Sequence, residues 1–255
     1  MNRFDTPLAR YLLGFVAHLL LLLAWYLFVR LGDVPKFVMP SPGDTLAALF
    51  APNYDWWANV RVTATEIFGG YLLALVVGVL LALAFTWSKL FEALMLPLLV
   101  TLNMVPKVAL GPLIIVWFKY GVFPNTMMAF AIAVFPILLT TARGLREIEP
   151  DLLDLVRSLR GSRWQLFTKI QLPGALPYVF AGMKVAAILA VAGAIVGEFL
   201  GSDRGLGYLM LQVQVTLDTP AMFMAVLLIT LLGMLLYGAV MLLEKLLIAK
   251  DARVT

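Results

Sequence analysis

Long apolar runs separated by short polar segments dominate the chain, and this pattern predicts membrane-spanning helices. About 20 predominantly apolar residues are enough to cross a hydrocarbon core of about 30 Å. Runs of this kind predict spans near Tyr11–Val29, Thr63–Thr86, Leu90–Phe118, Phe123–Thr141, Ala175–Gly197 and Ala221–Leu247. The expected fold is an all-α membrane protein of about six transmembrane helices, forming a single domain over residues 1–255.

The predicted third span, Leu90–Phe118, differs from the others because its apolar pattern is interrupted. Pro97, Pro106, Gly111 and Pro112 break it, and Asn103 and Lys107 place polar groups near its middle. Prolines free backbone carbonyls, which must be satisfied by protein or by water in a cavity. Two interpretations stay open: Lys107 lines a transport path, or it snorkels or pairs structurally, for example with Glu66 or Glu92.

Small residues recur every fourth position on two predicted spans. They are Gly70, Ala74, Gly78 and Ala82 on one, and Gly182, Ala186, Ala190 and Ala194 on the other. A spacing of four places each set on one helix face, where another helix can approach closely. One further step along the second set reaches Glu198, which we expect on a packed or cavity-lining face, either paired with Arg204 or acting at an outer gate.

Composition and charge agree with a membrane protein. The chain is 62% hydrophobic and 13% charged, and its mean hydropathy of +0.96 excludes an ordinary soluble domain. Twelve lysine and arginine residues fall on the N-terminal side of the membrane and five on the other, which predicts that both termini are cytoplasmic. The chain has no cysteine, so disulfides and thiolate metal sites are excluded.

The most charged segment lies between the fourth and fifth predicted spans. Leu152, Leu155, Val156 and Leu159 follow helical spacing and predict a short amphipathic helix over Asp151–Leu159. Arg160-Gly161 then breaks the helical pattern. Ser162 and Gln165 then form a capping box that begins a second helix, which we expect to run to Leu172 and stop at Pro173.

This segment resembles the "EAA" motif of permease subunits of binding-protein-dependent ABC importers, whose pattern is E-A-A-x-x-x-G followed later by L-P. Asp154-Leu155-Val156 stand for E-A-A, Arg160 stands where the glycine is usual, and Leu172-Pro173 supply the closing pair. The resemblance implies a type I importer permease in which residues 143–172 form a cytosolic coupling loop. The residues it assigns to ATPase coupling are Asp154, Arg157, Ser158, Leu159, Arg160, Gly161, Ser162, Arg163 and Trp164.

Other stretches are similar to the nitrate, sulfonate and taurine branch of that family. They are Pro40-Ser41-Pro42, the segment Pro106–Leu113 with Trp117-Phe118, and Gly197-Glu198-Phe199-Leu200 leading to Gly205-Leu206-Gly207-Tyr208. The last run looks closest to members that carry pyrimidine-type vitamin precursors. Asn103, Lys107 and Glu198 are the candidate residues of the translocation path.

The resemblance also implies partners and a location. Two permease copies, as a homodimer, would form the path in the bacterial inner membrane, in contact with lipid. Two cytosolic ATP-binding subunits would each bind one coupling loop, and an extracytoplasmic binding protein would deliver a sulfonate, nitrate or pyrimidine-type solute. No nucleic-acid partner is implied.

The sequence itself offers no catalytic chemistry. It contains no G-x-x-x-x-G-K-[ST] phosphate loop, so we expect a transport subunit without its own ATPase site, cofactor or metal. Two alternatives stay open. One is an ATP-independent secondary transporter or channel, which would need ion-coupling acids at the bilayer midplane, whereas Glu66 and Glu92 fall near predicted span ends. The other is a membrane assembly protein without cargo.

Overall fold

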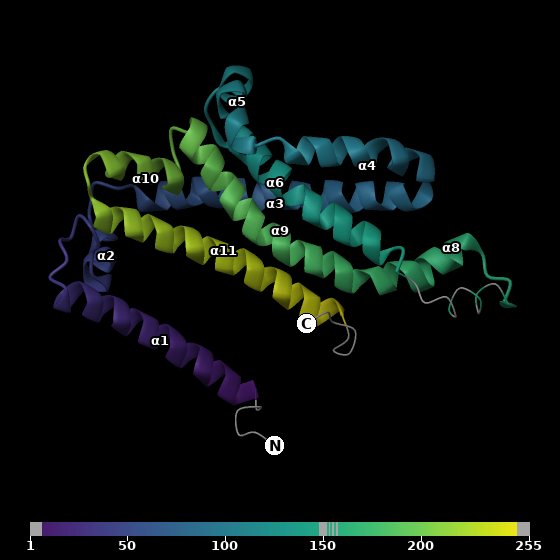
Figure 1. Ribbon diagram of the computed structural model, residues 1–255, viewed down its shortest axis with the longest axis horizontal. Coiled ribbons are helices and arrows are strands. Elements are labelled where there is room, and N and C mark those ends of the chain that lie inside the picture. The colour runs from purple at the N-terminus through teal and green to yellow at the C-terminus, as the bar shows by residue number, and fades with distance from the viewer. Residues whose placement is uncertain (1–6, 148–151, 153, 155, 157, 249–255) are drawn as a thin grey trace. The chain divides into compact units, whose positions relative to one another are not determined.

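The computed structural model describes residues 7–147, 152, 154, 156 and 158–248, and it is helical throughout the elements it describes (Figure 1). The elements, in chain order, are α1 (Pro7–Leu31), α2 (Pro42–Ala48), α3 (Trp56–Trp87), α4 (Lys89–Met104), the 3-10 helix η1 (Lys107–Leu110), α5 (Gly111–Phe118), α6 (Val122–Gly144), α8 (Arg163–Leu166), the π-helix η2 (Phe167–Gln171), α9 (Leu172–Gly201), α10 (Leu206–Val215) and α11 (Thr219–Leu247). The all-α prediction is confirmed.

Five helical segments among the described residues are long and apolar enough to cross a membrane. They are Leu12–Leu31, Trp56–Trp87, Val122–Gly144, Arg163–Gly201 and Thr219–Leu247. Each overlaps one predicted span.

The predicted third span is broken, as expected, but not at every proline. α4 ends at Met104, and Val105 is extended with ψ 124° because the residue before a proline is driven out of the helical region. Pro97, by contrast, lies inside α4 without ending it, so its predicted interruption is wrong. Proline is tolerated within apolar helices where neighbouring groups satisfy the freed carbonyl.

The chain divides into two compact units. The first holds the residues up to Trp56 together with Leu209–Leu228, and the second holds Trp57–Tyr208 and Ile229 onward. Helices α10 and α11 belong to the first unit for part of their length and to the second for the rest.

Polar contacts to backbone and side chains hold the connections of the first unit. Ser41 caps α2: its hydroxyl accepts from Asp44 N at 3.1 Å, and Asp44 completes a capping box from the third helical position. Pro42 follows in the first turn, where its missing N–H costs no hydrogen bond. The Tyr54 hydroxyl donates to Asp218 Oδ2 at 2.6 Å, and this hydrogen bond raises the pKa of Tyr54 to about 12.

In the second unit, the two predicted small-residue faces both pack on α6. A Cβ atom at Gly70 of α3 would lie 2.7 Å from Thr126 O, and one at Gly182 of α9 would lie 3.1 Å from Ile137 Cα. The alanines of both sets are fully buried. Small side chains therefore bring the backbones of α3 and α9 against α6, as the spacing predicted.

Candidate functional site

The predicted break between two short helices is present, and we call residues 152–171 the helical corner. Among its described residues, Leu152, Asp154, Val156 and Ser158 are helical. Arg160 adopts a left-handed conformation with φ +53°, and Gly161 N donates to Val156 O at 2.8 Å. This is the six-to-one bond of a Schellman ending. The left-handed residue of the corner is thus Arg160, which was matched above to the glycine of the E-A-A-x-x-x-G pattern.

Gly161 is required for a different reason, which is close approach. A Cβ atom there would lie 2.6 Å from Val156 Cγ1. Any larger residue at position 161 would therefore have to push the Val156 side chain aside. Gly161 therefore supports the same turn, one residue after the left-handed Arg160.

The second helix of the corner begins as predicted but does not end as predicted. Ser162 Oγ accepts from Gln165 N at 3.2 Å, and Gln165 Oε1 accepts from Ser162 N at 2.8 Å, which completes the capping box. The expected stop at Pro173 is wrong. α8 passes through η2 directly into α9, where Pro173 occupies the first turn and its missing N–H costs no hydrogen bond.

The helical corner presents apolar and cationic side chains that the described part of this chain does not cover. Leu159 is 73% exposed and Trp164 is 65% exposed. Asp154, Ser158, Arg160, Gly161, Ser162 and Arg163 are also exposed. Arg157, the remaining predicted coupling residue, lies outside the described residues.

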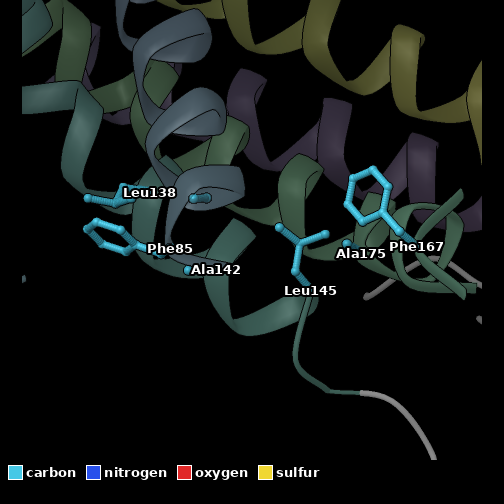
Figure 2. Close-up of a cluster of buried hydrophobic side chains, with 7 residues drawn as sticks. Phe85, Leu138, Ala142, Leu145, Phe167 and Ala175 are labelled. Carbon is cyan, nitrogen blue, oxygen red and sulfur yellow. The ribbon is translucent and has the colours of Figure 1, made fainter. Parts of the chain in front are cut away.

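One residue of the corner, Phe167, is buried among the membrane-length helices. It belongs to a cluster with Ala82, Phe85, Leu138, Ala142, Leu145 and Ala175, contributed by α3, by α6 and the residue after it, and by α9. Figure 2 shows Phe167 next to Ala175, with Leu145 beside them. Sequence analysis missed this role because an apolar residue in a short helix gives no sign of what it packs against.

Three further contacts are made around Phe167. The Phe167 ring lies 5.7 Å from the Trp164 ring and 5.7 Å from the Trp87 ring, which ends α3. Gln171 Nε2 donates to Leu145 O at 3.3 Å. The exposed Trp164 is therefore linked through Phe167 to α3, α6 and α9.

At the break in the third span, Lys107 binds its own chain. Its Nζ donates to Asn103 O at 2.7 Å and to Asn103 Oδ1 at 2.9 Å. Pairing of Lys107 with Glu66 or Glu92 is wrong, because Glu66 accepts from Asn125 at 2.8 Å and Glu92 pairs with Arg146. Asn103 and Lys107 both line a mostly apolar cavity of about 320 Å³ between α3, α4 and α6.

Glu198 is 1% exposed and accepts hydrogen bonds from Thr63 Oγ1 at 2.5 Å, from Gly207 N, and from Tyr208 N at 3.3 Å. The ion pairs found among the described residues do not include the expected alternative, Glu198 with Arg204. The prediction that Glu198 lies on a packed face is confirmed.

The sequence matches the family described as "Binding-protein-dependent transport system inner membrane component" over residues 74–248. This match covers more than half of the chain, and with the helical fold it shows that the protein belongs to this family of multi-pass inner-membrane ABC importer permeases.

Three curated relatives carry names that agree with the family. A "probable ABC transporter permease protein" of Haemophilus influenzae is 34% identical over 86% of this chain and 90% of its own. The "formylaminopyrimidine transport permease protein ThiX" of Halalkalibacterium halodurans is 30% identical over 90% of this chain and 92% of its own. The "riboflavin transport system permease protein RibX" of Chloroflexus aurantiacus is 33% identical over 99% of this chain and 94% of its own.

A solved structure supports the fold. A chain of the MetNI methionine ABC transporter in an inward-facing conformation superposes with a TM-score of 0.59, covering 78% of this chain and all of that one. The two chains are 19% identical, so the likeness concerns the fold alone.

Proposed function

We propose that this permease moves a small solute by alternating access, driven by separate ATPase subunits that bind the helical corner. The observation that carries the proposal is Phe167, which joins an exposed helical turn to the cluster among α3, α6 and α9. A force applied to the corner would pass into three membrane-length helices.

The chemistry of the corner fits a partner with an apolar groove and acidic surroundings. Leu159 and Trp164 offer exposed apolar surface, and Arg160 and Arg163 add positive charge beside it. An amphipathic helix laid in a groove is a recurrent mode of recognition. Because the sequence has no phosphate loop, ATP hydrolysis belongs to the partner.

The assembly that follows has two permease copies, two ATP-binding subunits and an extracytoplasmic binding protein. Both termini and the corner lie on the cytoplasmic side, where most of the basic residues fall. Closure of the ATP-binding subunits would move the two corners as rigid bodies and switch the access of the path. The cavity beside Asn103 and Lys107 is the candidate segment of that path.

For the cargo, we propose a pyrimidine-type heterocycle. Two of the relatives are named for heterocyclic compounds, a formylaminopyrimidine and riboflavin. The cavity beside Lys107 is mostly apolar, which suits a flat ring better than a compact anion. ATP-dependent uptake of labelled formylaminopyrimidine should exceed uptake of a sulfonate or nitrate; preference for either anion would overturn the cargo assignment.

Site-specific cross-linking tests the docking of the ATPase. The chain has no native cysteine, so a single Leu159→Cys variant provides one thiol on the corner. With a thiol-to-amine cross-linker, this variant should capture the ATP-binding subunit in membranes. Phe50→Cys is the matched control, because Phe50 is also exposed, at 83%, but lies between the first two predicted spans, on the side opposite the termini. Capture from position 50, or from neither position, would contradict the proposal.

The ATP-independent transporter remains the second candidate because Glu66 is not at a helix end. It lies ten residues inside α3, where buried acids can serve as ion-coupling groups. Reconstituted vesicles separate the two candidates: uptake that persists without ATP and follows a proton gradient would favour this second function.

A further inference from the structure

Two carboxyl groups meet inside the second unit, sealed from solvent. Glu66 on α3 is 0% exposed and Glu198 on α9 is 1% exposed. Their carboxyl groups lie within hydrogen-bonding distance of each other. The described ion pairs with lysine or arginine involve other carboxylates. Two adjacent buried carboxylates repel each other strongly, so such a pair is stable only when it holds a proton.

The hydrogen-bond donors around the pair are distributed unequally. Glu198 accepts from one hydroxyl and two backbone N–H groups, those of Thr63, Gly207 and Tyr208. These N–H groups open α10, a ten-residue helix whose N-terminal end favours negative charge. The surroundings of Glu198 therefore stabilise a carboxylate.

Glu66 has the opposite surroundings. Its Oε1 accepts a single hydrogen bond from Asn125 Nδ2 at 2.8 Å, and its Oε2 is buried without any donor among the described residues. A proton on Oε2 would remove this unsatisfied acceptor and supply the donor that the contact between the two carboxyl groups lacks.

We infer that Glu66 and Glu198 form a proton-holding carboxyl pair, in which Glu66 is protonated and donates to an ionised Glu198 that fixes the first turn of α10. Thr63 extends the same network, because its hydroxyl donates to Glu198 and accepts from Leu206 N at 2.8 Å. Asn59 adds an acceptor for Gly205 N at 2.8 Å. The turn between α9 and α10 is thus held by side chains of α3 as well as α9.

The two glycines of this turn fit around the Glu198 carboxylate. Gly205 has φ +111°, and any Cβ atom there would collide with the carboxyl group. A Cβ atom at Gly207 would lie 2.8 Å from Glu198 Oε2. The G-x-G spacing at 205–207 therefore gives the carboxylate access to backbone donors.

Glutamine substitutions test the assignment of the proton, because glutamine copies a neutral acid that donates but cannot carry charge. Glu66→Gln should keep the melting temperature of the purified protein within about 2 °C of the parent, whereas Glu198→Gln should lower it by roughly 5–10 °C. The reverse order would place the proton on Glu198, and equal losses or two stabilised variants would also overturn the inference.

Infrared spectroscopy in deuterated buffer at neutral pH supplies a readout that a purely structural role would not move. The parent and Glu198→Gln should show the carbonyl band of a buried protonated acid, and Glu66→Gln should lack it. A band that survives in Glu66→Gln overturns the inference. If Glu198→Gln fails to fold, Gly207→Ala tests the same contact against Gly238→Ala, whose Cβ would meet nothing within 4 Å; equal melting temperatures for these two would also overturn it.

These measurements need neither ATPase nor cargo. They are therefore independent of the proposed function, and loss of ATP-driven uptake in the parent protein would leave the carboxyl pair standing.

Discussion

Lys184 Nζ lies 2.8 Å from Glu244 Oε2 and joins α9 to α11 within the second unit. Glu244 is buried, and its other oxygen has no partner among the described residues. Charged groups inside a membrane-length helix are costly unless they are paired. The ion pair therefore lets two helices that carry opposite charges pack together.

Removing one member of this pair should cost more than removing both. Lys184→Met and Glu244→Gln should each lower the free energy of unfolding by about 3–5 kcal/mol, because each leaves a buried group without its partner. The double variant Lys184→Met with Glu244→Leu should recover most of that loss. Thermal unfolding of the purified variants gives the comparison; additive losses would contradict a coupled pair.

Removing the backbone strain at Arg160 should stabilise the helical corner. Arg160→Gly should gain about 1 kcal/mol locally, because glycine adopts φ +53° without a Cβ penalty. Limited proteolysis at the corner should slow accordingly. Arg160→Lys keeps the charge and the strain, so it is the matched control, and equal protection in both variants would argue against strain.

A bulky residue at Gly161 should open the corner and uncouple transport. Gly161→Val places a side chain against Val156, whereas Gly174→Val adds the same side chain where nothing lies within 4 Å. We expect ATP-driven uptake to fall at least several-fold in the first variant while membrane insertion persists. Parent-level uptake by Gly161→Val would refute the role of the corner.

Truncation of Phe167 should separate ATP hydrolysis from uptake. Phe167→Ala leaves a cavity in the cluster with Phe85 and Leu145, at a cost of about 3–5 kcal/mol. Phe167→Leu, which keeps most of the volume, should cost less than about 1.5 kcal/mol. The measurement is the ratio of transported solute to hydrolysed ATP in vesicles, and an unchanged ratio in Phe167→Ala would remove Phe167 from the coupling route.

Loss of the Lys107 ammonium should impair uptake if the break in the third span lines the path. Lys107→Ala removes both bonds to Asn103 and changes the cavity wall. Thr101→Val is the control, since it removes a comparable bond to Pro97 O on the exposed side of α4. Equal uptake in the two variants would reduce Lys107 to a helix cap.

Much of the fold could be predicted because membrane helices follow local rules. The membrane-length helices, the break at Pro106 and the capping box at Ser162 all depend on residues close together in sequence. The predictions that were wrong are also instructive. The expected stop at Pro173 misjudged where a helix begins, because a proline in a first turn looks the same in sequence as a proline that ends a helix.

The sequence by itself determined which segments are helices and which faces carry small residues, because helical periodicity is a property of neighbouring positions. Only the tertiary structure decided that Glu66 meets Glu198, that Lys184 meets Glu244, and that Phe167 enters the cluster of α3, α6 and α9. These partners lie many residues apart, and an acid within an apolar helix shows no partner until packing brings one to it. An unpaired charge away from water is costly, so the buried acids and Lys184 need partners, and the packing of the helices decides which partners they meet.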